Sequence, residues 1–266
     1  MNVIDFVYDG VALSQLGYMI CDLDGGGDLS ETENATRTFN NISMYNGKFM
    51  PFTSTTYEDR LEFSFDIIKL ICSGSDKPTI SSKEAQYLMR WLARPNANKL
   101  KFVHSDYADV YYEGSFNVTD LKIGDDRIGL RLTFVTNKPF GSYEAIWEKK
   151  EFTSTTDEMV ITDISDDAGY IYPYIEITCN EGGNLCLTNS YDSRDTIING
   201  CSEGEKIIIT ENLIMSSTML DHKVQNDFNY EFLKISNNFT NRTNRITSTM
   251  KCEVLISYNP IAKVVY

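Results

Sequence analysis

The most glycine-rich stretch of the chain has residue types and spacing that partly match a calcium-binding loop. With Asp22 as position 1, Asp24 takes position 3, Gly27 position 6 and Glu33 position 12 of the EF-hand template. Gly26 takes position 5 and offers no side-chain ligand, and the flanking sequence is strand-like where an EF-hand needs helices. We therefore interpret this stretch as a mobile, solvated acidic loop, and we predict no metal site and no cofactor.

The two histidines, His104 and His222, are the next candidates for chemistry. His104 precedes Ser105 and Asp106, and His222 follows Asp221. A hydrolytic triad needs its nucleophile on a sharp turn, and the sequence has no G-x-S-x-G. One histidine in each half also cannot build a usual zinc site. We interpret both as ordinary surface or packed residues and predict no catalytic residue.

Carboxylates and tyrosines leave two alternatives open, a β-rich glycoside hydrolase and a carbohydrate-binding protein. A hydrolase needs two carboxylates at a defined separation, and no pair stands out in the sequence. Tyrosines could form a platform on which a sugar stacks, although tyrosine in a strand more often packs half-buried, which is the interpretation we adopt. The two tyrosine groups are Tyr107, Tyr111 and Tyr112, and Tyr170, Tyr172 and Tyr174.

Composition narrows the class of protein. The 266 residues suffice for one large all-β domain or two ordinary domains. The formal net charge of −14 argues against binding nucleic acid or an anionic membrane. We see no membrane span and no signal peptide, and we expect synthesis in a cytoplasm before the protein joins something larger. The scattered cysteines are expected to be reduced: Cys21, Cys72, Cys179, Cys186, Cys201 and Cys252.

Strands dominate the elements that must position these residues. Residues 6–11 predict a strand entering an Asp-Gly turn, with 16–22 as its partner. A strand at 36–44 precedes the tight turn Asn46-Gly47. A long strand follows over 57–72, in which apolar residues alternate with polar ones. Its apolar set is Leu61, Phe63, Phe65 and Ile67.

One helix is predicted, and it must cover a sheet. Ser81 and Glu84 form a capping box at its start, and Pro95 ends it. One face of this helix is apolar and carries Ala85, Leu88, Trp91 and Leu92. Strands are predicted after it at 99–104, 110–118 and 127–136.

The composition changes after Phe140, where a segment of mixed polar and charged residues begins, and we place a domain boundary at about 142–150. The predicted domains are 1–145 and 146–266. Short strands at regular spacing indicate a β-sandwich in the second domain. They are expected at 174–179, 185–189, 196–198, 206–210, 230–235 and 248–258.

Taken in order, these segments resemble the distal tail protein family of long-tailed bacteriophages, over nearly the whole chain. The segments that carry the resemblance are Phe6-Val7-Tyr8-Asp9-Gly10, Tyr45-Asn46-Gly47 with the strand at 60–68, the helix at 84–92, Leu100-Lys101-Phe102, Tyr111-Tyr112-Glu113-Gly114, Asn137-Lys138-Pro139-Phe140, 230–238 and 253–260. One departure is Ser236-Asn237-Asn238, which replaces the family's usual Gly-x-Asn and leaves the shape of that turn open.

The resemblance implies a mainly β fold. It implies an N-terminal split β-barrel with one helix, like that of tail-tube proteins, and a C-terminal galectin-like or carbohydrate-module-like β-sandwich. It also implies a non-enzymatic virion protein of the tail tip or baseplate that forms a homo-hexameric ring. The ring would join the tail tube protein to the tail-tip hub (tail-associated) protein, anchor receptor-binding proteins, and let DNA pass through its channel without specific binding.

Two hypotheses extend this resemblance to individual residues, and one alternative stays open. The loop from Cys21 to Thr36 could reach across a subunit boundary, as could exposed strand edges. Acidic residues could line the channel and keep DNA from sticking. The alternative function is a carbohydrate-binding module protein that contacts host-wall glycans. The predicted ring-interface residues are Asp22, Asp24, Gly25, Gly26, Gly27 and Asp28.

Overall fold

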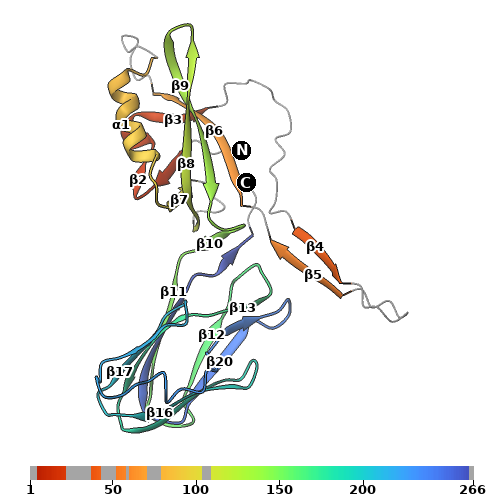
Figure 1. Ribbon diagram of the computed structural model, residues 1–266, viewed down its shortest axis with the longest axis vertical. Helices are drawn as coiled ribbons and strands as arrows, with labels where there is room; N and C mark the ends of the chain where they lie inside the picture. Colours follow the sequence, from red (N-terminus) through yellow and green to blue (C-terminus); the bar gives the residue numbers. More distant parts are fainter. Residues whose placement is uncertain are drawn as a thin grey trace. The chain divides into compact units, whose positions relative to one another are not determined.

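The chain divides into two compact units, which the computed structural model describes over residues 5–21, 37–42, 52–57, 60–70, 79–103 and 109–263 (Figure 1). For 37–42 and 52–57 only the backbone is described. One unit runs to Ser142 and includes the chain again from Lys263, and the other spans Tyr143–Ala262. Both are built mainly from antiparallel strands, which confirms the predicted mainly β class.

The first unit is an open sheet in the order β2-β1-β7-β8-β9-β6-β3, with β10 beside β8. The strand pairs along this path are antiparallel, and the path does not close on itself among the described residues. Its elements are β1 (Phe6–Tyr8), β2 (Val11–Ala12), the 3-10 turn η1 (Ser14–Leu16), β3 (Tyr18–Cys21), β6 (Glu62–Lys69), β7 (Asn98–Phe102), β8 (Val110–Ile123), β9 (Asp126–Thr136) and β10 (Gly141–Tyr143).

The predicted partner of the first strand was wrong. The Asp9-Gly10 turn, with φ of 49° and 77°, returns the chain at once into β2, so β2 and β7 take both sides of β1. The segment predicted as the partner forms β3, which pairs with β6 at the other edge of the sheet. The long strand predicted over 57–72 is likewise divided, because β5 ends at Tyr57 and β6 begins at Glu62.

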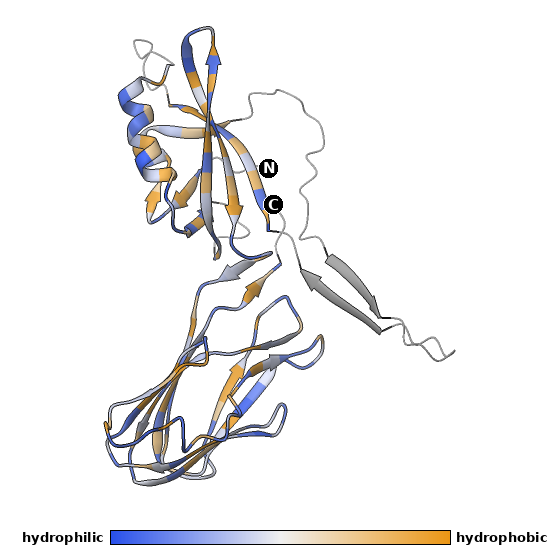
Figure 2. Cartoon of the chain, in the orientation of Figure 1, coloured by the Kyte–Doolittle hydropathy of each residue, from blue (hydrophilic) through white to orange (hydrophobic). Residues whose placement is uncertain are grey.

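The predicted helix is confirmed as α1 (Ser82–Leu92), which lies against one face of this sheet (Figure 1). The capping box forms as expected: Ser81 Oγ accepts from the Glu84 amide at 3.3 Å, and Glu84 Oε2 accepts from the Ser81 amide at 2.8 Å. Figure 2 shows the hydrophilic side of α1 turned away from the sheet. The ring of Trp91 stacks on Phe6 with centroids 5.7 Å apart, so the apolar face covers the sheet as predicted.

The second unit is the predicted β-sandwich. A five-stranded sheet has the order β11-β21-β14-β17-β18, and a four-stranded sheet has the order β12-β20-β15-β16. Their strands are β11 (Ile146–Phe152), β21 (Cys252–Tyr258), β14 (Tyr174–Cys179), β17 (Lys206–Ile209), β18 (Met215–Ser217), β12 (Glu158–Thr162), β20 (Thr243–Ser248), β15 (Gly183–Asn189) and β16 (Arg194–Cys201). A ribbon of β13 (Gly169–Ile171) and β19 (Ile235–Asn237) and the short β22 (Ile261–Ala262) complete the unit.

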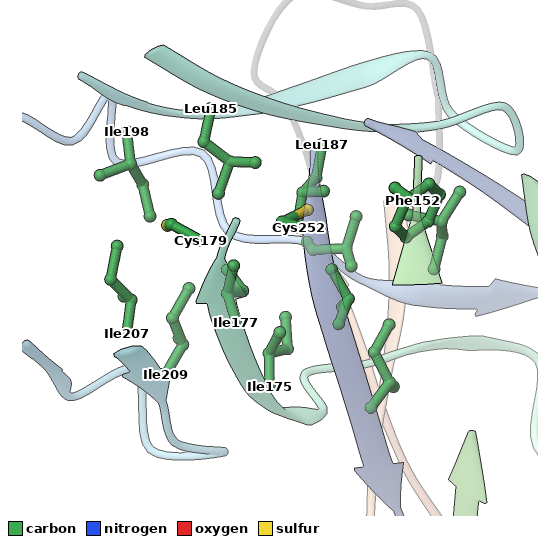
Figure 3. Packing of buried hydrophobic residues seen from close by; sticks show 14 of the residues in the cluster. Phe152, Ile175, Ile177, Cys179, Leu185, Leu187, Ile198, Ile207, Ile209 and Cys252 are labelled. Atoms are coloured by element: carbon green, nitrogen blue, oxygen red, sulfur yellow. The ribbon is translucent and has the colours of Figure 1, made fainter. Parts of the chain in front are cut away.

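One hydrophobic core lies between these two sheets. Figure 3 shows Leu185 and Leu187 of β15 directed toward Ile175 and Ile177 of β14, and all four side chains are buried. Because each strand places alternate residues inward, the opposite faces stay polar. The unit therefore buries its apolar side chains within its own two layers.

Two predictions in this unit need correction, and one strand was not predicted. The charged segment after Ser142, where we placed the domain boundary, holds the unpredicted edge strand β11, whose exposed side accounts for its charge. The strand predicted over 230–235 is missing, because Tyr230 has a φ of 60° and regular pairing begins only at Ile235. The strand predicted over 248–258 begins at Cys252. Ser248 Oγ bonds the carbonyl oxygen and the amide of Met250, which turns the chain from one sheet to the other.

Candidate functional site

The residues predicted at the ring interface, Asp22, Asp24, Gly25, Gly26, Gly27 and Asp28, lie outside the described residues, so their role stays a prediction. The same holds for the rest of the EF-hand-like stretch, for His104 and for Tyr107. Where the structure does describe the chain, no three His, Cys, Asp or Glu side chains come together as a metal site. In the same ranges no helix is long and apolar enough to cross a membrane.

The first unit has a strand edge that no described strand covers. β9 pairs with β6 along Glu62–Ile68, whereas β3 reaches only Asp66–Lys69 on the other side. Among the described residues, the first half of β6 therefore has one side without a neighbouring strand. Such an edge presents main-chain N–H and C=O groups that can pair with another chain.

A two-stranded ribbon is the second feature of this kind. β4 (Arg37–Ile42) and β5 (Phe52–Tyr57) pair antiparallel over their full lengths, and no third described strand joins them. An isolated two-stranded ribbon is only marginally stable in water, because its backbone bonds have no covering layer. The ribbon therefore needs a further surface to be well ordered.

The face of the first sheet opposite α1 is polar. Ser64 Oγ lies 3.0 Å from Thr133 Oγ1, and Asn117 occupies the next strand in that row. In the adjacent row Arg131 donates from Nε and Nη2 to the two carboxylate oxygens of Asp66, at 2.8 and 2.9 Å. These rows thus carry hydroxyl and amide groups and a neutralised charge pair.

The β8–β9 hairpin extends beyond the predicted strand end at Val118. Arg127 donates to both carboxylate oxygens of Asp120 at 2.7 Å, which ties the two strands together near their turn. This hydrogen-bonded guanidinium holds the pKa of the Asp120 carboxyl below its usual range. Gly124, with a φ of 63°, makes the turn, and the apolar side chain of Ile123 is exposed beside it. The hairpin thus ends in an exposed apolar side chain.

A buried Glu–His–Ser group in the second unit is the closest approach to a catalytic arrangement. His222 Nδ1 donates to Glu205 Oε1 at 2.6 Å, and Ser217 Oγ donates to the same oxygen at 2.5 Å. The amide of Ser202 donates to Glu205 Oε2 at 2.9 Å. The hydroxyl is therefore bonded to the carboxylate and not to the imidazole, so no base is placed to activate it.

The Glu–His–Ser group stabilises the fold through the hydrogen bonds and charge of Glu205 and His222. Burial alone disfavours the charged imidazole, but the hydrogen bond and charge of Glu205 outweigh it and raise the pKa of His222. Burial also opposes ionisation of Glu205, yet the hydrogen bonds from Ser217, Ser202 and His222 lower its pKa. Sequence reasoning treated His222 only as an ordinary residue, because its partner lies seventeen residues away with no local signal.

The tyrosines that were candidates for a sugar platform differ in how far they are exposed. Tyr111 and Tyr112 are buried, and Tyr174 is half-buried, so the packing interpretation is confirmed for these three. Tyr170 is 57% exposed and its ring meets that of Tyr172. Four cysteines in the described part of the chain are free thiols, as predicted: Cys179, Cys186, Cys201 and Cys252.

Comparison with models of protein families identifies the family of this chain. A model of a phage tail protein N-terminal domain matches residues 1–138, and a model of a phage tail C-terminal domain matches residues 142–258. No curated protein matches the sequence.

Comparison with solved structures shows which fold the chain resembles. The chain is similar to the crystal structure of the SPP1 Dit protein, described as a paradigm of the hub adsorption apparatus in phages that infect Gram-positive bacteria. The identity is 11%, the match covers 97% of this chain and 99% of that chain, and the TM-score is 0.63. A chain of the phage P2 baseplate in its activated conformation with Ca also matches, at 11% identity, 97% and 98% coverage and a TM-score of 0.40. The fold implied by the resemblance to distal tail proteins is confirmed, and the chain belongs to the phage tail protein family defined by these two domains.

Proposed function

We propose that this protein is the distal tail protein of its phage and forms a homo-hexameric ring at the tail tip. The ring connects the tail tube protein to the tail-tip hub or baseplate, and it anchors receptor-binding proteins. The role is structural and non-enzymatic, and the protein is made in the host cytoplasm before it joins the virion. The observation that carries this proposal is made on the described residues of the tail-family N-terminal domain, where part of β6 and the β4–β5 ribbon have no further strand beside them.

The ring closes through main-chain pairing between neighbours. In a closed ring each subunit offers two different surfaces, one of which receives the other. The uncovered side of Glu62–Phe65 in β6 is one such surface, and the β4–β5 ribbon is the natural occupant. Pairing between β6 of one subunit and the ribbon of its neighbour would form main-chain hydrogen bonds along both strand edges. The acidic loop that begins at Asp22 extends the same contact in this proposal.

The polar face of the first sheet lines the channel of the ring. The acidic lining stays a prediction: Glu62 is exposed on this face of β6, and the two rows that follow it carry little net charge. Ser64, Thr133 and Asn117 are uncharged, and the carboxylate of Asp66 is neutralised by Arg131. A surface of this kind gives DNA phosphates little to bind, since affinity for DNA requires cationic side chains that displace counterions.

Light scattering of the purified full-length protein tests the ring. The expected mass is six times 30.3 kDa, with six-fold rings in electron micrographs. Replacing residues 37–57 by a short Gly-Ser linker should give a monomer with an unchanged unfolding transition of the second unit. A hexamer that survives this replacement would refute the role of the ribbon. A wild-type monomer that stays monomeric when mixed with the tail tube protein would refute the ring itself.

A further inference from the structure

Two buried cysteine thiols of the second unit meet at the base of one hairpin. Cys179 is the last residue of β14, and Cys201 is the last residue of β16. Their thiols are hydrogen-bonded to each other. Figure 3 shows the sulfur of Cys179 on the side of Ile198, and Cys201 Sγ donates to the Ile198 carbonyl oxygen at 3.6 Å. The two sulfurs therefore share one small region of the core, in which both residues are buried.

The backbone holds these two positions together. The chain leaves the five-stranded sheet after Cys179, forms the β15–β16 hairpin, and returns to the five-stranded sheet in β17. The Cys179 amide donates to the Glu205 carbonyl oxygen at 2.8 Å, and the Gly204 amide donates to the Cys179 carbonyl oxygen at 2.8 Å. Cys201 pairs with Gly183 at the open end of the hairpin. A bond between the two sulfurs would thus join the places where the chain crosses from one sheet to the other and back.

The other two thiols of this unit are less suited to such a bond. Cys252 lies opposite Cys179 on β21, but its Sγ lies 3.3 Å from Ser248 Oγ, and Figure 3 shows the Cys179 sulfur directed away from it. Cys186 Sγ lies 3.7 Å from Thr188 Oγ1. The residues on both sides of Cys186 are buried in the core, so its own side chain points to the opposite face of the strand.

We propose that Cys179 and Cys201 are an oxidative modification site, at which a disulfide forms after the virion leaves the cell. The inference rests on the proposed function for this change of surroundings. The protein is made in a reducing cytoplasm and then serves on a virion, where disulfides form and persist. Because the two thiols already touch, small rotations of their side chains bring the sulfurs together.

The oxidant is a peroxide, which is small enough to enter through a local opening at the strand end. The hydrogen bond that Cys179 donates holds the pKa of the Cys201 thiol below its usual range, so Cys201 ionises first. Its thiolate attacks one oxygen of hydrogen peroxide, the O–O bond breaks, and the departing hydroxide takes up the thiol proton as water. The Cys179 sulfur then displaces the hydroxyl of the resulting sulfenic acid, which leaves with the Cys179 proton as a second water. Two electrons pass from the two thiols to the peroxide.

Peroxide treatment of the full-length protein, purified under reducing conditions, tests the site. Remaining thiols are alkylated, and cleavage after Glu181 and Arg194 places Cys179, Cys186 and Cys201 on separate peptides. We expect mass spectrometry to find one linked pair of peptides that contains Cys179 and Cys201 and that a reductant separates. The disulfide would close a loop of 23 residues, so the unfolding midpoint of the second unit should rise by about 5–10 °C.

Matched variants separate this pair from the other thiols. Cys201→Ala should abolish both the link and the rise in the unfolding midpoint, whereas Cys186→Ala should keep both. If Cys201→Ala does not fold, the peptides of the wild type still decide. Three results would overturn the inference: a link between Cys179 and Cys252, alkylation of Cys179 and Cys201 after peroxide treatment, and oxidation of Cys201 to a sulfinic acid without a link.

The site and the ring are measured separately, because light scattering reports the assembly. A linked protein that stays monomeric in the presence of the tail tube protein would refute the ring and leave the site in place. A hexamer in which Cys179 and Cys201 stay unlinked after peroxide treatment would refute the site and leave the ring in place.

Discussion

The buried Glu205–His222 pair predicts a stability of the second unit that depends on pH. Glu205 is fully buried and accepts three hydrogen bonds, so its charge is compensated only by these partners. Glu205→Gln keeps the shape of the side chain and removes the charge, which leaves the buried imidazole with only the half-exposed carboxylate of Asp227, 3.5 Å from Nε2. Breaking a buried pair from one side costs about 3–5 kcal/mol in general. We expect about 2–4 kcal/mol here at pH 5.5, because glutamine still hydrogen-bonds.

The pH window follows from the two shifted pKa values. The pKa of His222 is raised above its usual 6.5, so its contribution is complete below that pH and is lost as pH rises through the folded-state pKa. The pKa of Glu205 is lowered below its usual 4.5, so its contribution is complete above that pH and is lost as pH falls through the folded-state pKa. Both contributions are therefore present between pH 4.5 and 6.5. The cost of Glu205→Gln should be lower at pH 8.5 than at pH 5.5, because the contribution of the charged imidazole is lost as pH rises from 6.5 through the folded-state pKa of His222.

Hydrogen exchange of peptides covering β14 and β17 measures the opening free energy of this unit within the full-length protein. The matched control is Glu176→Gln, because Glu176 forms a partly exposed ion pair with Lys206 at 2.6 Å. That change should cost less than about 1 kcal/mol, with no difference between the two pH values. An equal cost of Glu205→Gln at pH 5.5 and 8.5 would refute the argument. So would a wild-type opening free energy that does not fall between pH 5.5 and pH 8.5.

Three further predictions concern packing and independence of the units. Gly114→Ala places a methyl group 2.2 Å from a backbone oxygen of β9, so urea unfolding should show a loss of about 3 kcal/mol, against less than about 1 kcal/mol for Gly182→Ala. Asp66→Asn removes a carboxylate that is 5% exposed and accepts hydrogen bonds from the guanidinium of Arg131, so it should lower the free energy of unfolding by about 1–3 kcal/mol. Asp120 is more exposed, and Asp120→Asn should cost less than about 1 kcal/mol in the same assay. Residues 143–262 alone should fold cooperatively as a monomer, by circular dichroism and light scattering.

Features fixed by neighbours in sequence were predictable. The helix that begins after Ser81 was found because its cap and its apolar stripe lie within one short segment. The inward alternation of β6 was found for the same reason, and Phe63 and Ile67 are buried as expected. The β-sandwich followed from the regular spacing of short strands, although its strand pairing did not.

Features fixed by distant residues could not be predicted. β3 carries no local sign that it pairs with β6, because the early return into β2 decides the matter. The charge of β11 suits an exposed edge strand and a linker equally well, so composition could not separate them. The φ of 60° at Tyr230 prevents a regular strand from starting there. The side chain of Asn229 holds this turn by accepting a hydrogen bond from the Glu231 amide, and the sequence pattern does not reveal that bond.

The two units differ in how far their own strands cover one another. The second unit buries its apolar residues between its own sheets, and its buried Glu205 has its partners within the same unit. The first unit instead has, among its described residues, a half-covered β6 and a ribbon without a third strand. A strand edge exposed to water presents N–H and C=O groups with which a neighbouring copy can pair. The proposed assembly through strand edges therefore rests on the first unit.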